Sequence, residues 1–248
     1  MINTELNYVQ DINLNNVWRE AMLLCIKNGY DFVVKGGSYK GQIRKQLPSV
    51  TIKIEQPRLR PLAPIVNPPH LPPTSDEKIE EYFLNYIMST EVKKNEDYTY
   101  GQFIVPQVDR IIEILKQAKG NSNQACISVG NEHSAFLVDP PCLRVLSFKV
   151  VEKQLILSVF FRSWDLYAGL PENLGGFQLL KEYVLDQLQD EMEVCDGPII
   201  AYSDGLHIYE QYFQLANDLN MSKIVVTENV LKDKELFNRE LDNENSNL

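Results

Sequence analysis

Two β-rich runs joined by a short turn constrain the fold of this chain more than any other part of its sequence. The runs, LRVLSFKV and QLILSVFF, are separated only by a turn around Glu152-Lys153. Apolar and β-branched residues on both sides of so short a turn predict an antiparallel hairpin. In its register, Cys142 lies across from Arg162 and Ser163 to within a residue. The sequence therefore predicts a thiol beside a permanent cation at one end of a hairpin.

Helices and further strands are predicted on both sides of this hairpin. Helical spacing of apolar residues predicts helices over 14–28, 76–89, about 105–118 and the run FQLLKEYVLDQLQDE. The remaining strands are predicted in DFVV, GQIRKQL, VTIKIE, ACISVG, IIAYS, the start of HIYEQYFQLANDL, and KIVVTE. We therefore expect an α+β fold in which a large mixed β-sheet is flanked by helices, built as a single domain over residues 1–248.

Several residues mark where these elements begin and end. Gly29 is expected to cap the first helix, and Thr74 with Glu77 forms a capping-box pattern before the second. Gly197-Pro198 is expected to break the chain before IIAYS. Residues 57–73 contain seven of the 13 prolines, which predicts an extended surface connector or a flap over a site. The polar tail, 236–248, is expected to be frayed.

The composition argues against several classes of protein. No stretch reaches the roughly 18 apolar residues of a membrane span, and the polar start, MINTELNYVQDINLNN, is unlike a signal peptide. The net charge of -10 opposes broad binding to nucleic acid or to anionic lipid. Four cysteines without CxxC spacing predict free thiols and no zinc site. We expect a cytoplasmic protein with no metal, no membrane contact and no nucleic-acid partner.

Cys142 has two interpretations. A guanidinium beside it favours the thiolate, which is the nucleophilic form of cysteine, and the same guanidinium of Arg162 can hold a phosphate. Alternatively, Cys142 is a small buried hydrophobe and Arg162 a charge at a strand end. Spacing alone does not separate these interpretations.

The residues that follow the hairpin carry further polar groups. Arg162-Ser163-Trp164-Asp165 precedes the start of the fourth helix, a place where phosphates bind well. Asn173 is either the cap of that helix or a reader of a base, because a carboxamide can donate to uracil O4 while it accepts from N3–H.

Two more segments are candidates for ligand contacts. His207 and Tyr209 lie two residues apart, hence on one face of a strand, where they either grip a sugar hydroxyl or sit at the edge of the core. The turn Gly36-Gly37-Ser38 has the small residues that let a phosphate approach the backbone.

The order and spacing of four motifs resemble the thymidylate synthase family. PPC ends at Cys142, RSWD begins twenty residues later, and GLPEN and DGLHIY follow at intervals very similar to those of the family's cysteine, arginine and histidine blocks. The resemblance covers roughly residues 98–210, and the N-terminal third resembles the family only through GQIRKQLPSVTIK. The RSWD variant and the proline-rich N-terminal part are most similar to compact archaeal-type members.

The resemblance implies a thymidylate synthase-like fold, a homodimer packed through its sheets, and one-carbon transfer to C5 of a pyrimidine nucleoside monophosphate. Cys142 is expected to attack C6 of the base and so turn C5 into a carbon nucleophile. The expected one-carbon donor is a reduced folate, either 5,10-methylenetetrahydrofolate or a methanopterin analogue. Loss of the C5 proton and hydride transfer from the folate then convert dUMP into dTMP.

The matching positions also imply which residues bind the nucleotide. Arg162 and Ser163 are expected to bind the phosphate, Asn173 the base, and His207 with Tyr209 the 3′-hydroxyl of the ribose. Each of these residues stands at the position of its motif.

Two acidic residues are assigned by the same resemblance. Asp165 is expected to bind the pterin of the folate. Glu81, on the helix after the proline-rich segment, is matched to the family's catalytic glutamate, which organises proton transfer. The alternative for Glu81 is an exposed charge on a helix.

Three features depart from the family. Leu143 follows the nucleophile, where bacterial and eukaryotic synthases usually have histidine, and the family's cross-dimer arginine pair is missing from residues 121–124. The chain ends in NRELDNENSNL in place of an apolar closure segment. The phosphate charge must then be met by other cations. The candidates, each of which is also interpretable as a surface charge, are Lys35, Arg44, Arg58 and Arg60.

These departures leave the product of the reaction open. Hydride from the folate gives a methyl group and water gives a hydroxymethyl group, so the exclusion of water decides between them. A 5-hydroxymethylase of dUMP, dCMP or CMP is thus the alternative to a synthase. A third hypothesis is a non-catalytic nucleotide-binding paralogue, against which the intact Cys142, Arg162 and Asn173 argue.

Overall fold

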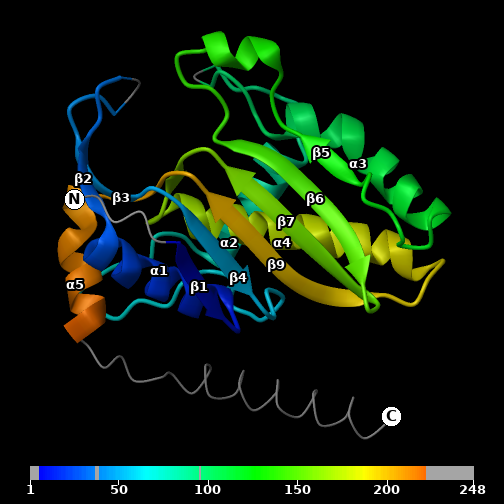
Figure 1. Cartoon of the computed structure of the whole chain (residues 1–248), viewed down its shortest axis with the longest axis horizontal. Helices are drawn as coiled ribbons and strands as arrows, with labels where there is room; N and C mark the ends of the chain where they lie inside the picture. The colour runs from blue at the N-terminus through cyan, green and yellow to red at the C-terminus, as the bar shows by residue number, and fades with distance from the viewer. Residues whose placement is uncertain (1–5, 37–38, 95, 222–248) are drawn as a thin grey trace, which may run out of the picture.

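The predicted hairpin lies in the larger of two β-sheets (Figure 1). A computed structural model describes residues 6–36, 39–94 and 96–221 of the chain. Strands β6 (Leu143–Val151) and β7 (Gln154–Phe161) pair antiparallel in the expected register. Glu152 and Lys153 have φ angles of 50° and 63°, the left-handed conformation that a two-residue hairpin turn requires.

The larger sheet is mixed and has six strands in the order β1-β4-β9-β7-β6-β5. The pairs β1/β4 and β7/β9 are parallel, and the others are antiparallel. Its other strands are β1 (Asn7–Asp11), β4 (Val50–Ile54), β5 (Cys126–Ser128) and β9 (Cys195–Ser203).

The smaller sheet has four strands in the order β2-β3-β10-β8. It joins segments that are far apart in the sequence, because β3 and β8 flank β10 on opposite sides. Its strands are β2 (Tyr30–Val33), β3 (Ile43–Leu47), β8 (Trp164–Asp165) and β10 (Leu206–Tyr209).

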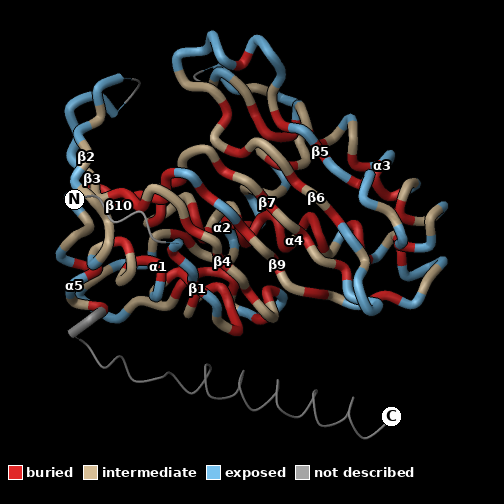
Figure 2. The backbone as a smooth tube through the Cα atoms, in the orientation of Figure 1, coloured by how far each residue is buried: buried red, intermediate tan, exposed pale blue. Residues whose placement is uncertain are grey.

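Among the described residues, helices cover one face of the larger sheet and leave the other face open. In Figure 1, α2 and α4 lie behind the sheet, α3 lies behind β5 and β6, and α1 and α5 lie at the end formed by β1. The apolar core lies between the helices and the sheet, as the buried segments of Figure 2 show. The helices are α1 (Leu14–Asn28), α2 (Asp76–Tyr82), α3 (Gly101–Gln117), α4 (Gly169–Gln189) and α5 (Phe213–Met221), with a π-helical turn at Phe83–Ile87 and 3₁₀ turns at Glu132–Phe136 and Glu210–Tyr212. The prediction of an α+β fold with a large mixed sheet flanked by helices is confirmed.

The first helix has the predicted bounds, the second begins at the predicted residue with a different cap, and α3 and α4 begin earlier than predicted. Ser75, and not Thr74, caps α2, because its hydroxyl accepts a hydrogen bond from the backbone N–H of Lys78 at 3.3 Å. Helix α3 begins at Gly101 and contains Pro106 in its second turn, where the missing N–H removes the one hydrogen bond that would reach the carbonyl of Gln102.

Strand β9 continues through Gly197-Pro198, where a break was predicted. The pairing with β7 shifts between Leu155 and Leu157, beside this dipeptide. Proline has no N–H for the ladder, so a bulge accommodates it inside the strand. The predicted strand KIVVTE and the tail 236–248 lie outside the described residues.

The proline-rich segment has no helix or strand, as predicted, but it is anchored along its length. The backbone N–H of Ile65 donates to Asn15 Oδ1 of α1 at 2.8 Å, and His70 Nε2 lies 2.7 Å from Asp218 Oδ2 of α5. Leu62 is 2% exposed. The segment is therefore packed against the fold at several points.

The open face of the larger sheet carries aromatic and aliphatic side chains. Tyr8 and Tyr202 are 54% and 37% exposed, and the ring of Phe160 stacks on that of Tyr202 with centroids 5.6 Å apart. Ile200, on the same face of β9, is half-buried. Within the described part of the chain, no helix combines the length and the apolar character needed to cross a bilayer.

Candidate active site

The hairpin brings Cys142 and Arg162 together. The backbone N–H of Arg162 donates to the Cys142 carbonyl at 2.9 Å, and guanidinium Nη2 lies 3.6 Å from Cys142 Sγ. The same guanidinium donates from Nε to the carbonyl of Pro141 at 3.1 Å, and from Nη2 to that of Pro140. Arg162 thus contacts both the thiol and the two prolines that precede it in the chain.

The electrostatics at the thiol combine opposing effects. Burial raises the pKa of Cys142, Arg162 lowers it, Asp139 raises it and Arg44 lowers it. Arg162 favours the thiolate, as expected, but desolvation outweighs it, so the resting group is a neutral thiol at pH 7. Cys25, which is fully buried, has its pKa raised to about 12 by burial and fits the interpretation of a packed hydrophobe.

Four tyrosines line the approach to the thiol, and the sequence analysis did not identify them. The hydroxyl of Tyr100 accepts a hydrogen bond from the N–H of Leu143 at 3.3 Å. Tyr98 and Tyr86 pack on Tyr100 with centroids 5.9 and 5.2 Å away, and Tyr82 stacks on Tyr86 at 5.3 Å. Burial raises the pKa of all four, that of Tyr98 to about 12, so the hydroxyls stay protonated at neutral pH. Two spacings in the sequence could have identified this cluster. Tyr82 and Tyr86 are four residues apart in a helical segment, and Tyr98 and Tyr100 are two residues apart just before α3.

Asn173 lies inside α4 and does not cap it. The helix begins at Gly169, about one turn before Asn173, so the interpretation of Asn173 as the N-cap is wrong. The indole N–H of Trp164 donates to Asn173 Oδ1 at 2.9 Å, and Asn173 Nδ2 donates to the hydroxyl of Tyr82 at 2.7 Å. The amide is therefore held between β8 and α2.

Asp165 has one occupied and one open carboxylate oxygen. Its Oδ2 accepts hydrogen bonds from the backbone N–H groups of Ala168 and Gly169, both at 2.9 Å, and so caps α4. Its Oδ1 is buried and has no hydrogen-bond partner among the residues that the structure describes. Burial raises the pKa of Asp165. An orphaned buried acceptor of this kind fits a ligand N–H group.

His207 and Tyr209 lie on one face of the smaller sheet, as predicted from their spacing. His207 pairs with Gln46 on one side and with Asp165 on the other, and Tyr209 pairs with Arg44. His207 Nδ1 lies 2.9 Å from the carbonyl of Gly205, which can only accept, so Nδ1 carries the proton. Burial lowers the pKa of His207 to about 3, so Nε2 of the neutral ring offers a lone pair to a hydroxyl.

The four candidate cations have different surroundings in the structure. The guanidinium of Arg44 lies 4.5 Å above the ring of Phe32, and Nη2 donates to Gln46 Oε1 at 2.7 Å. Its Nε is buried and finds no partner within the described part of the chain. Its charge lowers the pKa values of Cys142 and Asp165 and therefore acts on the same region.

The other three candidate cations, Lys35, Arg58 and Arg60, are exposed. Arg60 pairs with Glu182 at 2.9 Å. The turn next to Lys35 includes residues 37–38, which lie outside the described residues.

Glu81 is not brought to the site. Its side chain is exposed on α2, while its neighbour Tyr82 turns toward α4 and meets Asn173. Ser163 is half-buried between Arg162 and Trp164 in the chain.

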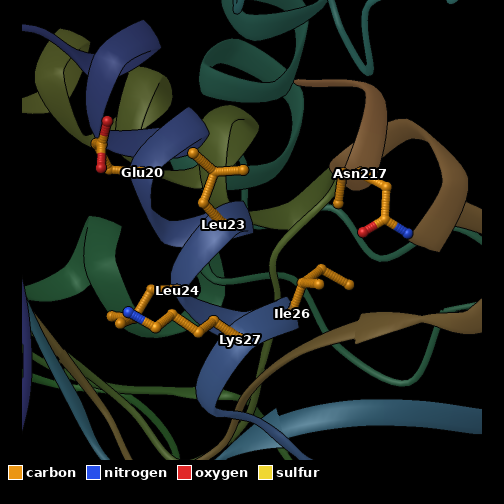
Figure 3. Close-up of a pocket in the computed structure, with 7 residues that line it drawn as sticks. Glu20, Leu23, Leu24, Ile26, Lys27 and Asn217 are labelled. Carbon is orange, nitrogen blue, oxygen red and sulfur yellow. The ribbon is translucent and has the colours of Figure 1, made fainter. Parts of the chain in front are cut away.

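A groove elsewhere on the molecule shares no residue with this site. It lies between α1 and α5, has a volume of about 450 Å³, and is shown in Figure 3. Its lining residues are Glu20, Leu23, Leu24, Ile26, Lys27, Ala216 and Asn217. No group of three or more His, Cys, Asp or Glu side chains suited to a metal ion occurs among the residues that the structure describes.

Several known proteins are similar to this chain. A protein named "Putative thymidylate synthase" from Methanosarcina barkeri is 26% identical over 212 residues, which cover 83% of this chain and 91% of that protein. One of the same name from Methanothermobacter marburgensis is 31% identical over 150 residues, 58% of this chain and 65% of that protein. The thermostable thymidylate synthase A of Bacillus subtilis has a similar fold, with a TM-score of 0.61 and 17% identity over 84% of this chain and 83% of that chain.

The family comparison covers most of the chain. The profile of the family described as thymidylate synthase matches residues 76–241, which include Cys142, Arg162, Asn173 and His207. A one-carbon transferase is the class of enzyme that this match supports. With the thiol, the guanidinium and the amide already placed around one site, the match shows that this chain belongs to the thymidylate synthase family.

Proposed function

We propose that this chain transfers a one-carbon unit from a reduced folate to C5 of a pyrimidine nucleoside monophosphate and converts dUMP into dTMP. The observation that carries the proposal is the 3.6 Å contact between Arg162 Nη2 and Cys142 Sγ, set by the register of the hairpin. A buried thiol beside a guanidinium, with a fixed amide and a neutral imidazole on neighbouring elements, suits nucleophilic addition to a base.

The role of Cys142 follows from its surroundings. Burial keeps the thiol neutral at rest, and Arg162 and Arg44 stabilise the thiolate when the proton leaves. The sulfur forms a bond to C6, and the electrons of the C5–C6 double bond move toward O4. The N–H of Asn173 is the group suited to that developing charge. C5 then becomes the nucleophile for the one-carbon unit.

The nucleotide is bound by groups on both sheets. We assign the phosphate to Arg162 and Ser163, with Arg44 as the cation that makes up for the absent arginine pair. Nε2 of neutral His207 accepts from the ribose hydroxyl, and Tyr209 is the second polar group on that face. Arg44 supports this assignment because its Nε is buried and has no partner among the described residues.

The residues present fit a reduced folate. Asp165 Oδ1 is the orphaned buried acceptor, and a pterin has amino and ring N–H donors for it. When bound, the folate supplies the one-carbon unit and, in a synthase, the hydride. Methylenetetrahydrofolate and a methanopterin analogue share these donors, so either satisfies Asp165.

The test of this function is product mass together with adduct formation. With methylenetetrahydrofolate and 5-fluoro-dUMP, we expect mass spectrometry to find a covalent adduct on the peptide that contains Cys142. With dUMP, we expect a product heavier by one CH₂ unit. A folded protein that forms no adduct would remove the cysteine mechanism, and a hydroxymethylated product would replace the synthase with the hydroxymethylase.

We also propose a homodimer formed through the open face of the larger sheet. The exposed aromatic rings of Tyr8 and Tyr202, with Phe160 and Ile200, give this face an apolar surface that one helix layer leaves uncovered. A two-fold dimer places the same patch on both sides of an interface. The cytoplasmic location expected from the sequence stays a prediction.

The replacement Ile200→Glu tests the dimer. Wild type is expected to sediment as a dimer, with twice the chain mass of 28.5 kDa. Ile200→Glu is expected to sediment as a monomer, because the interface would bury one unpaired carboxylate from each subunit. Tyr183→Glu, at an exposed position on helix α4, is the matched control and should stay dimeric. A monomeric wild type at micromolar concentration contradicts the proposal.

A further inference from the structure

The amide of Asn173 lies between two partners with different hydrogen-bonding abilities. Trp164 Nε1 donates to Oδ1 at 2.9 Å, and Nδ2 donates to the Tyr82 hydroxyl at 2.7 Å. An indole N–H can only donate, so the amide atom that faces it must be the oxygen. A tyrosine hydroxyl can donate or accept and tolerates either end of an amide. Of the two partners, only Trp164 distinguishes the two orientations of the amide.

Both partners are themselves fixed in place. Trp164 is 2% exposed, and its ring stacks on Phe161 with centroids 4.1 Å apart and planes 6° apart. Tyr82 stacks on Tyr86 and lies against Gly176, where an added Cβ would come within 2.9 Å of the Tyr82 ring. Neither group can move away from Asn173 without disturbing packed neighbours.

The locked amide leaves one N–H on Nδ2 and one lone pair on Oδ1 for a ligand. The edge of uracil presents a carbonyl at C4 and an N–H at N3, which complement these two groups in one order. Cytosine presents an amino group at C4 and an acceptor at N3, which require the opposite order. To bind cytosine in the same place, the amide must flip.

We propose that Trp164 is a positioning residue that sets the base selectivity of this site by locking Asn173 in the orientation that pairs with uracil. This inference rests on the proposed function in one respect, namely that a pyrimidine base lies against Asn173. A flipped amide turns its NH₂ group toward the indole N–H, so two buried donors face each other and neither is satisfied. Leaving a buried donor unsatisfied corresponds to a loss of roughly 10- to 100-fold in binding.

The experiment measures dissociation constants for dUMP and dCMP by calorimetry on wild type, Trp164→Phe and Tyr82→Phe. Wild type should prefer dUMP, and Trp164→Phe should lose roughly 10-fold or more of that preference, because either orientation of the amide is then allowed. Tyr82→Phe is the matched control: it also removes one hydrogen bond to Asn173, but the lost partner accepted both orientations. Its preference for dUMP should stay within about twofold of wild type while both affinities fall.

A second substitution separates the lost donor from lost packing. β-(3-Benzothienyl)alanine at position 164 keeps the shape of the indole and replaces its N–H with sulfur, so it should reproduce the loss of preference in a fully folded protein. An unchanged preference in this protein overturns the inference, as does an equal loss of preference in Tyr82→Phe. A wild type that binds neither nucleotide overturns the proposed function as well. If wild type prefers dUMP and the variants at position 164 keep that preference, the inference about Trp164 is overturned and the proposed function is not.

Discussion

Turnover by Cys142→Ser is expected to fall by about 10⁴-fold or more, the scale on which the removal of a covalent nucleophile acts. A serine hydroxyl ionises far less readily than a thiol, and the guanidinium 3.6 Å from Sγ only partly offsets burial even for the thiol. The covalent adduct with 5-fluoro-dUMP should disappear. Noncovalent binding of dUMP should change by less than about tenfold, because Arg162, Asn173 and His207 remain in place.

The control for this substitution is Cys126→Ser. Cys126 is an exposed cysteine at the start of β5, so the same chemical change there should leave turnover within about twofold of wild type. Steady-state kinetics and intact-protein mass spectrometry on both variants complete the comparison. Adduct formation or near-normal turnover by Cys142→Ser contradicts the role given to this thiol.

Lys181→Met is expected to lower the free energy of unfolding by about 3–5 kcal/mol, the cost of leaving a buried charge without its partner. Lys181 Nζ lies 3.3 Å from Asp196 Oδ1, and the two side chains are 0% and 5% exposed. The ammonium also donates to the carbonyl of Gly197. Without it, the carboxylate of Asp196 keeps the amide of Gln178, which donates at 3.1 Å.

Two further variants make this stability prediction specific. The double variant Lys181→Met/Asp196→Asn should recover most of the loss, because it removes both charges. Arg110→Met breaks an exposed pair with Glu113, whose side chains are 62% and 59% exposed, and should cost at most about 1 kcal/mol. Urea denaturation measures all three. A loss for Lys181→Met as small as that for Arg110→Met contradicts the prediction.

The Lys181–Asp196 pair also makes the free energy of unfolding depend on pH. Burial lowers the pKa of Lys181 from 10.5 to about 8, and Asp196 raises it in part. Between pH 8 and 10.5 the unfolded chain holds a proton that the folded protein has lost, so this group makes the folded state relatively more stable as pH rises. Wild type should therefore gain stability relative to the double variant over that range.

The sequence allowed the local part of the site to be predicted, because local geometry depends on few residues. The turn at Glu152-Lys153 fixes which residues of the hairpin face each other to within one residue, so the sequence places Cys142 opposite Arg162 or Ser163. A register shift between Leu143 and Val145, which the sequence does not reveal, makes Arg162 the partner. The period of two along a strand places His207 and Tyr209 on one face of β10.

The contacts between distant segments could not be predicted in this way. Nothing near Asn173 in the sequence shows that Tyr82, on another helix, is its partner, and Glu81 looks equally suitable until the helix is placed in three dimensions. Arg44 could not be distinguished from the other basic residues before β3 was paired with β10. Pro198 in β9 shows the same limit, since tertiary pairing overrides a local break signal.

The register of the hairpin also limits which insertions and deletions this chain can accept. The turn at the far end of the hairpin lies about 30 Å from Cys142, as nine residues of strand imply at about 3.3 Å each. Together with the register shift between Leu143 and Val145, it sets which residue stands beside the sulfur. A register slip of one residue reverses the facing of every side chain in the second strand, and a slip of two moves the guanidinium by about 7 Å. Surface turns usually accept length changes freely. Here a length change is compatible with the reaction only when the loop takes it up and the register of the two strands stays the same.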